Sequence, residues 1–409
     1  MKVVILNDAS VARGGATGLA LLQAQSLAAR GIKTTFVTGD RGEEATLAAQ
    51  GVAVVALGHD PLMRAPPHVA ATRGLWSRRV AADVAKLVAA QDTPDTVYHV
   101  HSWSKTLTPS VFTALRSVAA RVFIHAHDFF LACPNGGYMD YRRMQACDRV
   151  PLSYDCLTTN CDKRSYAQKL WRVSRQRLLR RALPPDAPWG GVLMIHPAMA
   201  PHLERGGWPP HLLQTLRNPA TPLISERVRA EDNSGALFIG RVEAEKGVED
   251  AAIAAGIAGL SLTVVGEGPL RQRLTQRYPN VRFTGWLDRQ AIGTEAARAR
   301  VVVMPSRYPE PFGLVAAEAS LSGLPVLTSQ TAFLGPEITS AGLGMMCDTR
   351  DPTSFAAALS AIEGFPAASI AEISRRGRSG AAGLSTTPDC WIDMQIAFYN
   401  AALKPSAAA

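Results

Sequence analysis

The sequence predicts an α/β protein with parallel sheets, arranged in two domains. Short apolar runs of strand type alternate with helix-like stretches, an alternation typical of βαβ units. The runs fall into two series, separated by an irregular segment from Asn218 to Ser234. A chain of 409 residues is long enough for two full hydrophobic cores. We therefore expect one domain over residues 1–217 and a second over residues 218–386.

The first series contains six expected strands and a glycine pair. Arg13-Gly14-Gly15-Ala16 follows the first strand and opens a helical stretch from Leu19 to Ala29. Gly14 and Gly15 fit two interpretations: a tight turn that needs glycine, or a backbone loop that lies close to a bound ligand such as a phosphate group. The pair lacks a full G-x-G-x-x-G, so its spacing does not decide between them. The expected strands are Val3–Leu6, Thr34–Val37, Val52–Ala56, Thr96–Val100, Val122–His125 and Val192–Ile195.

The second series contains five expected strands, with helices in the gaps between them. Two helices, Pro352–Ile362 and Ala367–Ala382, close this series. A further helix, from about Pro388 to Leu403, lies beyond its last unit and carries apolar residues such as Trp391 and Phe398, so residues 387–409 form a third segment. The expected strands are Ala236–Ile239, Leu260–Val265, Val281–Phe283, Val301–Met304 and Pro325–Thr328.

Positive charge is concentrated in one half of the chain. Residues 1–217 hold 26 Lys and Arg against 15 Asp and Glu, whereas residues 218–409 hold 17 against 19. The excess predicts an anionic partner for the first half, such as a phospholipid leaflet or a lipid diphosphate. Nucleic acid is not expected as a partner, because no nucleic-acid-binding module is recognisable.

No uninterrupted apolar run approaches the roughly 18 residues of a membrane span, although 47% of the residues are hydrophobic. The chain enters a strand directly at Lys2, without the pattern of a signal peptide. These observations lead us to expect a cytoplasmic protein.

An insert over residues 130–165 has little periodicity and holds most of the cysteines. In a reducing cytosol disulfides are not expected, so a structural zinc site and four unrelated thiols both remain open. Only Cys156 and Cys161 are spaced near the usual zinc range, yet a loop of this length needs something that orders it. The candidate zinc ligands are Cys133, Cys147, Cys156 and Cys161.

Residues 163–181 predict a basic amphipathic helix. Leu170 and Val173, and Trp171 with Leu178, share helical spacing, and eight Lys and Arg residues lie among them. Two interpretations remain open: a core-packed helix with a solvated basic face, or a contact with a membrane surface. We favour the peripheral membrane contact, because few acidic residues lie nearby in the sequence.

The run from Arg300 to Ala319 reads as a buried strand, a loop and the start of a helix. Val301–Met304 is a continuous apolar run, typical of a strand that is covered on both faces, and a helix is expected to begin near Pro311. Amides at the start of a helix lack intrahelical partners and attract anions. We therefore predict a diphosphate-binding site, called the diphosphate seat, at the amides of Phe312, Gly313 and Leu314.

Glu310 and Glu318 flank this seat. On a helix their offset is roughly 12 Å at about 1.5 Å per residue. Glycosidase carboxylates stand roughly 5 to 9.5 Å apart, so the spacing does not suit hydrolysis. Two carboxylates around a phosphate seat instead suit the two ends of a nucleotide sugar, with sugar hydroxyls at one and ribose hydroxyls at the other.

The segment from Glu310 to Glu318 resembles the E-x7-E signature of retaining glycosyltransferase family 4, part of the glycosyl transferases group 1. The resemblance implies the GT-B fold, in which two Rossmann-like doubly wound domains face a cleft. Gly240-Arg241-Val242-Glu243-Ala244-Glu245-Lys246-Gly247 matches the family's G-R-x-x-x-x-K-G, whose Arg and Lys grip the donor diphosphate. Two further motifs match, around Gly266 and around Gly285-Trp286, which would line the donor site and read the base.

The resemblance also assigns roles outside the second domain. His127, in a His-Asp-aromatic sequence after the fifth strand, resembles the family's histidine that contacts the transferring sugar, whereas His99 and His101 are expected to be core residues. Gly14 and Gly15 match the family's N-terminal loop. In this fold the last helix crosses back to the N-terminal domain.

The resemblance implies a retaining, metal-independent glycosyltransferase. Arg241 and Lys246 would replace a metal cation, and no protein nucleophile is required. The expected donor is a nucleotide diphosphate sugar, and the expected acceptor is a saccharide or lipid-linked saccharide of a bacterial surface polysaccharide, at the inner face of the cytoplasmic membrane. Two alternatives are a nucleotide-sugar epimerase of the same fold and a non-catalytic scaffold that binds nucleotide sugar or membrane.

Overall fold

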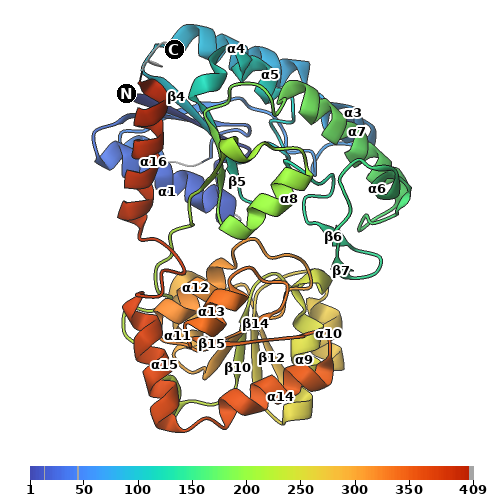
Figure 1. Ribbon diagram of the computed structural model, residues 1–409, viewed down its shortest axis with the longest axis vertical. Helices are drawn as coiled ribbons and strands as arrows, with labels where there is room; N and C mark the ends of the chain where they lie inside the picture. Colours follow the sequence, from blue (N-terminus) through green and yellow to red (C-terminus); the bar gives the residue numbers. More distant parts are fainter. Residues whose placement is uncertain (13, 44–45, 405–409) are drawn as a thin grey trace. The chain divides into compact units, whose positions relative to one another are not determined.

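The computed structural model describes residues 1–12, 14–43 and 46–404 (Figure 1). The chain divides into two compact units. Unit 1 comprises Met1–Tyr138, Asp148–Arg217 and Pro388–Ala409, and unit 2 comprises Met139–Cys147 and Asn218–Thr387. A short segment of the cysteine-bearing insert, Met139–Cys147, thus belongs to unit 2 although it lies within the first half of the sequence.

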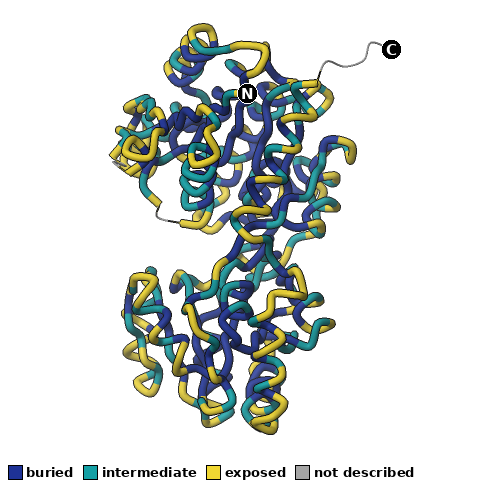
Figure 2. Tube along the Cα trace, turned by 90° about the vertical axis from the view of Figure 1, so that its left-hand side faces the viewer, coloured by how far each residue is buried: buried dark blue, intermediate teal, exposed yellow. Residues whose placement is uncertain are grey.

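Unit 1 is built on a parallel sheet of seven strands in the order β3-β2-β1-β4-β5-β8-β9. The central strands are continuous apolar runs because helices cover them, and β1, β4 and β5 are almost entirely buried. Figure 2 shows this burial along the middle of the unit. The strands are β1 Lys2–Asn7, β2 Lys33–Thr38, β3 Ala53–Ala56, β4 Thr96–Val100, β5 Val122–Ala126, β8 Gly191–Met194 and β9 Leu213–Thr215.

The helices of unit 1 include one from the far end of the sequence. Helix α1 packs against α16, and α4 packs against α5. Between the strands and α16, the core contains Phe36, Phe123, Leu193, Trp391 and Tyr399, all almost fully buried. The helices are α1 Gly15–Ala29, α2 Thr46–Ala49, α3 Pro67–Arg73, α4 Arg78–Gln91, α5 Val111–Leu115, α6 Tyr154–Thr158, α7 Tyr166–Ala182, α8 Ala200–Arg205 and α16 Pro388–Leu403.

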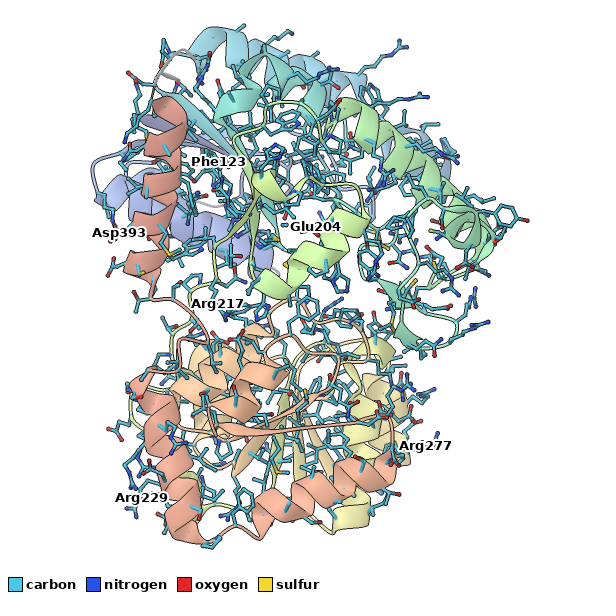
Figure 3. The ribbon with its side chains drawn as sticks, viewed as in Figure 1. Phe123, Glu204, Arg217, Arg229, Arg277 and Asp393 are labelled. Atoms are coloured by element: carbon cyan, nitrogen blue, oxygen red, sulfur yellow. The ribbon has the colours of Figure 1, made fainter. Side chains whose placement is uncertain are left out.

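A buried polar cluster fixes α16 to the rest of unit 1. The Gln23 amide on α1 donates to the Tyr399 hydroxyl at 2.6 Å and also contacts Gln395 on α16. His99 on β4 bonds to the same Tyr399 hydroxyl and to the Gln23 amide. On the outer side of α16, Asp393, labelled in Figure 3, pairs with Arg30 at 3.3 Å. Buried polar atoms of this kind are costly unless they are paired, so the cluster specifies where α16 docks.

Unit 2 is built on a second parallel sheet, of six strands in the order β12-β11-β10-β13-β14-β15. Its strands are β10 Ala236–Ile239, β11 Leu262–Val265, β12 Val281–Gly285, β13 Val301–Met304, β14 Val326–Ser329 and β15 Gly344–Cys347. Its helices are α9 Val248–Ala258, α10 Arg271–Arg277, α11 Arg289–Ala296, α12 Leu314–Leu321, α13 Gly335–Ser340, α14 Pro352–Glu363 and α15 Ala367–Ser379. A small antiparallel pair, β6 Met139–Asp140 and β7 Gln145–Ala146, also belongs to this unit.

The α/β class and the two parallel sheets are as the sequence predicts, but several details differ. Strands β9 and β15 and the pair β6–β7 were not expected. Helix α12 begins at Leu314 rather than near Pro311, because Gly313 adopts a left-handed conformation with φ 77° and caps the helix. Glu310 therefore precedes the helix, and the estimated helical offset between Glu310 and Glu318 does not apply.

No single helix in the described part of the chain has the length and apolar character to cross a membrane. Helices α14 and α15 pass such a test only together, by length and composition, with a bend of 97° between them.

We predict that Tyr399→Phe destabilises the protein by about 1–3 kcal/mol, because the Gln23 amide and His99 would lose a buried hydroxyl partner. The urea midpoint of unit 1, followed through its tryptophan fluorescence, measures the change. Asp393→Ala on the same helix is the control: its side chain is 68% exposed, and the ion pair with Arg30 should contribute less than about 1 kcal/mol. Equal midpoints for Tyr399→Phe and wild type would contradict the prediction.

Candidate functional site

The motifs of the second domain lie at one edge of the unit 2 sheet. Strands β12, β11, β10 and β13 are adjacent and parallel, so their carboxyl ends meet on the same side. The loops that follow them carry, in sheet order, Gly285-Trp286, Gly266, the segment from Gly240 to Lys246, and the segment from Ser306 to Glu310. The sheet thus gathers four segments that are dispersed over about 70 residues of sequence.

An ion pair between Lys246 and Glu310 lies at the centre of this edge. Lys246 Nζ is 2.6 Å from Glu310 Oε2 and donates a second bond of 2.6 Å to the Tyr308 hydroxyl. Ser306 Oγ donates to the same carboxylate at 2.8 Å. The side chains of Lys246 and Glu310 are only 19% and 13% exposed. An ammonium group has three N–H donors, so one remains for an incoming anion.

The pair keeps Glu310 ionised. Burial acts to raise the pKa of Glu310, but the charge of Lys246 and hydrogen bonds from Lys246, Tyr308 and Ser306 hold that pKa below its ordinary value. Burial and the Glu310 charge raise the pKa of Tyr308, which therefore stays a neutral phenol. Glu310 is thus a hydrogen-bond acceptor for hydroxyl groups, not a proton donor.

Arg241 lies in the same loop but is open to solvent. Its guanidinium donates to Glu243 Oε1 at 2.7 Å, and its side chain is 65% exposed. A long exposed cation with one surface ion pair can turn toward an anionic ligand at little cost. The structure therefore places one fixed cation, Lys246, and one adaptable cation, Arg241, on the loop that follows β10.

Glu318 lies on α12 and is paired with a residue that the sequence analysis did not identify. Glu318 Oε1 is 3.0 Å from Arg289 Nη1, and the carboxylate is 12% exposed. Burial raises the pKa of Glu318, and the nearby Arg289 opposes this shift. Arg289 also donates to the Thr221 carbonyl and hydroxyl at 3.0 and 2.7 Å. Arg289 thus holds Glu318 in one orientation.

Two glycines permit close packing at this edge. A Cβ on Gly266 would lie 1.9 Å from the Gly240 carbonyl oxygen, so only glycine lets the loops after β11 and β10 approach so closely. Gly313, with φ 77°, would meet Met304 Cε at 2.6 Å. It turns the chain so that the amides of Leu314 and Val315 become the first amides of α12, which have no intrahelical acceptor. Phe312, expected to share this role, is buried before the helix.

Trp286 follows β12 and is one of the exposed large apolar residues, with 73% of its surface accessible. Gly285, which precedes it, has φ 81° and accepts a hydrogen bond of 2.8 Å from the Gly266 amide. An exposed indole beside backbone groups can stack on an aromatic ligand. This arrangement fits the expected base-reading role, which stays a prediction.

In unit 1, Gly14 and Gly15 lie at the start of α1. Gly14 is extended, with φ 179°, and a Cβ on either residue would have no neighbour within 4 Å. A tight turn therefore does not explain these glycines. An open backbone at a helix start is compatible with the alternative interpretation, a close approach by a ligand.

His127 follows β5 and belongs to a stack of four histidines. Gln23 Oε1 accepts from His101 Nε2 at 2.7 Å, which makes His101 Nδ1 the acceptor for His127 Nε2 at 2.9 Å. Burial lowers the pKa of His127 to about 3, so the ring is neutral and its Nδ1 is an acceptor. An acceptor nitrogen suits contact with a sugar hydroxyl.

His99 and His101 are core residues, as expected, with 0% and 3% exposure. Ligand atoms of His99, His101 and His125 lie within 4.8 Å of one another. Their rings are stacked, at 12° between His99 and His101 and 22° between His101 and His125. Lone pairs of nearly parallel stacked rings do not converge on one ion, so we assign no metal to this group.

A buried lysine and an asparagine lie beside three of the four cysteines that were candidate zinc ligands. Lys169 Nζ, buried on α7, lies 3.3 Å from Cys156 Sγ and 3.1 Å from Cys161 Sγ, so a cation already stands between these sulfurs. Cys133 Sγ contacts Asn135 Oδ1 at 3.2 Å. Lys169 and Asn135 thus supply polar partners for the three cysteines of unit 1, and the zinc site stays a prediction.

The basic helix α7 differs from the expected pattern. Arg175 is buried, donates to the Ser104 carbonyl at 3.0 Å and lies over the rings of Trp103 and Phe130. Arg172 pairs with the buried Asp162 at 2.8 Å. The charges turn inward because rings and acceptors from distant segments face them. The basic residues of 163–181 that remain exposed are Lys163, Arg164, Arg177 and Arg181.

The described fold is that of GT-B glycosyltransferases. Anabaena HepE in complex with UDP superposes with a TM-score of 0.66 at 17% identity, over 98% of this chain and 100% of HepE. Sucrose-phosphate synthase of Thermosynechococcus elongatus gives a TM-score of 0.71 at 18% identity, over 98% and 99% of the two chains. Residues 233–363 match the model of the family Glycosyl transferases group 1.

Curated relatives match about a third of the chain. Glycogen synthase of Mycobacterium tuberculosis is 36% identical over 164 residues, 37% of this chain and 38% of the enzyme. A GDP-mannose-dependent α-(1-6)-phosphatidylinositol dimannoside mannosyltransferase of the same organism is 36% identical over 138 residues, 32% and 35% of the two chains. The chain thus spans little more than a third of the length of these relatives.

Sequence reasoning missed Ser306, Tyr308 and Arg289. A signal existed for Tyr308, since residues two apart in an extended segment share a side, and Tyr308 precedes Glu310 by two. No such signal links Arg289 to Glu318, because the two are 29 residues apart and meet only through the fold.

Glu310→Gln should lower the free energy of unfolding at pH 7 by about 3–5 kcal/mol, because it leaves Lys246 buried without a counter-charge. The pKa of Glu310 is lower in the folded than in the unfolded chain. The ionised Glu310 carboxylate therefore stabilises the folded protein fully above its unfolded pKa of about 4.3. This stabilisation is lost as the pH falls through the lower pKa that the group has in the folded chain. Denaturant unfolding of both proteins between pH 7 and 3 should show the difference shrinking with acid. A difference independent of pH would contradict the assignment, and Glu372→Gln, on an exposed carboxylate of α15, is the control.

Metal analysis of protein purified without chelator tests the cysteine cluster. We expect no stoichiometric zinc, because Lys169 occupies the space between Cys156 and Cys161. One zinc per chain, lost in Cys156→Ser but not in Cys390→Ser, would restore the four-cysteine site; Cys390 is exposed on α16 and serves as the matched control.

Proposed function

We propose that the protein is a retaining glycosyltransferase that moves a sugar from a nucleotide diphosphate sugar to a saccharide or lipid-linked saccharide, without a metal ion. The arrangement that carries this proposal is the Lys246–Glu310 pair, at the edge where four strand ends meet and beside the first amides of α12. The loops after β10 and β13 and the start of α12 thus hold a fixed cation, a fixed hydrogen-bond acceptor and amides without intrahelical partners. The match of residues 233–363 to the model of Glycosyl transferases group 1 supports it.

The proposal gives a binding position to each part of the donor: the diphosphate, the sugar, the ribose and the base. The diphosphate binds the third N–H of Lys246, the guanidinium of Arg241 and the amides of Leu314 and Val315. Sugar hydroxyls donate to Glu310, and ribose hydroxyls donate to Glu318, which Arg289 holds in position. The base stacks near Trp286.

Bond cleavage develops negative charge on the departing diphosphate. Lys246 is already oriented by Glu310 and Tyr308, so it meets this charge without reorganisation, which is the condition under which fixed donors accelerate a reaction most. The acceptor hydroxyl attacks from the leaving-group side, and a donor phosphate oxygen takes its proton. Lys246, the fixed cation, and Arg241, the adaptable cation, then neutralise the nucleoside diphosphate. The proposed reaction therefore needs no metal.

Unit 1 supplies the acceptor side of the proposal. His127 offers its Nδ1 to a sugar hydroxyl, and the open backbone at Gly14 and Gly15 lets a ligand approach. The excess of basic residues over residues 1–217 suits a lipid-linked acceptor at the inner face of the cytoplasmic membrane. A role in bacterial surface polysaccharide synthesis is part of this proposal, and a relative named as a phosphatidylinositol dimannoside mannosyltransferase favours a lipid-linked acceptor.

Thermal unfolding with a panel of nucleoside diphosphates and their sugars tests the donor site. A ligand at about 100 times its dissociation constant adds about 2.7 kcal/mol, which shifts the midpoint measurably. We expect a shift with one base, reduced in Glu318→Ala because the ribose loses its acceptor, and unchanged in Glu372→Ala, which removes an exposed carboxylate on α15.

The base identified in this way selects the donor for transfer assays. Nuclear magnetic resonance of the product should show the anomeric configuration of the donor retained. An inverted product would overturn the retaining mechanism, and release of free nucleotide without any acceptor would favour an epimerase. No shift with any nucleotide would overturn the donor site.

A further inference from the structure

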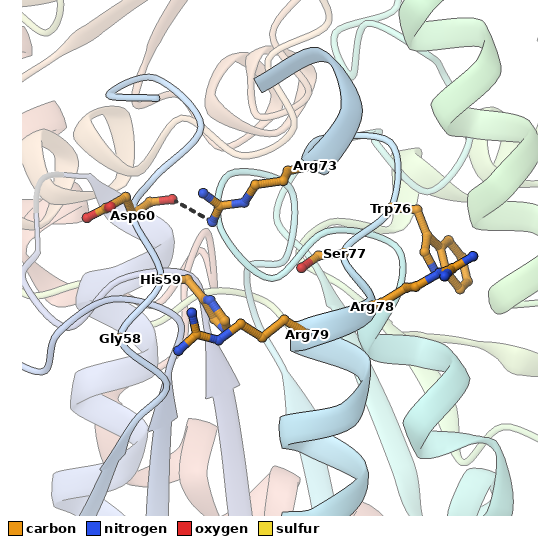
Figure 4. Close-up of a pocket in the computed structure, with 8 residues that line it drawn as sticks. All are labelled: Gly58, His59, Asp60, Arg73, Trp76, Ser77, Arg78 and Arg79. Atoms are coloured by element: carbon orange, nitrogen blue, oxygen red, sulfur yellow. Dashed lines mark hydrogen bonds between the residues drawn. The ribbon is translucent and has the colours of Figure 1, made fainter. Parts of the chain in front are cut away.

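A pocket in unit 1 takes no part in the proposed donor chemistry. It has a volume of about 360 Å³ and lies where the chain leaves the edge strand β3 and where α4 begins (Figure 4). Carboxyl ends of parallel strands are the usual places for ligands in sheets of this type. Its lining includes His59, Arg73, Trp76, Ser77, Arg78 and Arg79.

Positive charge dominates this pocket. Three arginines and one carboxylate, Asp60, line it. Asp60 pairs with Arg41 at 3.2 Å, and the neighbouring Asp83 lies 3.9 Å from Arg79 Nε. The Arg79 side chain is 76% exposed, so its guanidinium is free to reorient. Arg73 donates only a long bond of 3.5 Å to the Asp60 carbonyl, drawn as a dashed line in Figure 4. The planar donor forks of arginine match the oxygens of a phosphate.

His59 provides an independent sign of a ligand. It is only 4% exposed, and within the described part of the chain its Nε2 makes no hydrogen bond; Asp83 Oδ2 is 3.3 Å away without suitable geometry. Figure 4 shows the Arg79 guanidinium beside the His59 ring. Buried polar nitrogens almost always have a partner, and the weak contact with Asp83 leaves this nitrogen able to bind a better-placed acceptor in the pocket.

The start of α4 adds amides to the same wall. Ser77 caps this helix of 14 residues by accepting from the Val80 amide at 3.3 Å. The amides of Arg78 and Arg79 precede Val80 in the first turn and have no intrahelical acceptor. Together with the guanidinium groups of Arg73 and Arg79 and the His59 nitrogen, they form a set of donors for one compact anion.

The geometry points to a binding site for a phosphate monoester in this pocket, with Arg73, Arg79 and His59 as its principal donors. A dianion matches the excess of arginine charge, and the volume leaves room for a small group attached to the phosphate. The site lies entirely in unit 1, whereas the donor seat lies in unit 2, so the inference goes beyond the proposed function and does not rest on it. The phosphate belongs either to a soluble phosphorylated compound or to a lipid headgroup.

The experiment is a calorimetric titration with inorganic phosphate at constant ionic strength, in an Arg241→Ala background that weakens phosphate binding at the donor seat. We expect one saturable site, with affinity reduced at least tenfold by Arg79→Ala and by Arg73→Ala. Arg116→Ala, an exposed arginine of unit 1 outside the pocket, should leave the affinity unchanged. His59→Gln, which keeps a donor, should lose less than His59→Leu, and circular dichroism reports whether each variant is folded.

Vesicles distinguish the two sources of phosphate. If the ligand is a lipid headgroup, vesicles with phosphatidic acid should bind the wild type at least tenfold better than the Arg79→Ala variant, and neutral phosphatidylcholine vesicles should bind neither. If the ligand is a soluble compound, glycerol 1-phosphate should compete with inorganic phosphate for the site. Vesicles should then not bind. Absence of saturable binding to every probe, or equal losses in Arg79→Ala and Arg116→Ala, would overturn the proposal. Because Arg241→Ala is present throughout, failure of this site does not bear on the donor site, and the reverse also holds.

Discussion

The buried ion pair of Lys246 and Glu310 is the constraint on which the ligand-binding edge of unit 2 depends. Removing two charges from water is costly, and neither would be tolerated there alone. The pair therefore ties the loop after β10 to the loop after β13 and fixes both relative to the first amides of α12. Tyr308 and Ser306 complete the bonds of the two charges. The site is thus ordered by its own electrostatics before any ligand arrives.

The sequence predicts unit 2 well wherever a local pattern fits only one type of secondary structure. The run Val301–Met304 can only be a covered strand, and its bounds agree with the structure. The strand β15 was missed because Gly344-Met-Met-Cys347 lacks the β-branched residues that mark strands. Pro311 suits a first helical position and so predicts too early a start for α12, whereas the left-handed conformation of Gly313 moves the start to Leu314.

Unit 1 was harder to predict because its polar groups meet across long stretches of chain. A helical pattern counts Arg175 as a surface residue, yet the rings of Trp103 and Phe130 and the Ser104 carbonyl cover it. Burial even lowers the pKa of Arg175 to about 10. His127 was located through family resemblance, but its tautomer follows only from bonds that begin at Gln23. Local periodicity carries no information about such partners.

The docking of α16 has a consequence for how the protein folds during synthesis. The bond between Gln23 and Gln395 joins residues 372 positions apart. Until α16 has left the ribosome, the apolar surface of α1 that it covers and the Gln23 amide lack their partners, so unit 1 is completed late although it begins first. The continuous segment Asn218–Thr387 is synthesised before α16 and can fold earlier. Ribosome pausing or premature termination before Pro388 would thus release chains whose first-made half is the unfinished one, with an exposed apolar face for chaperones to recognise.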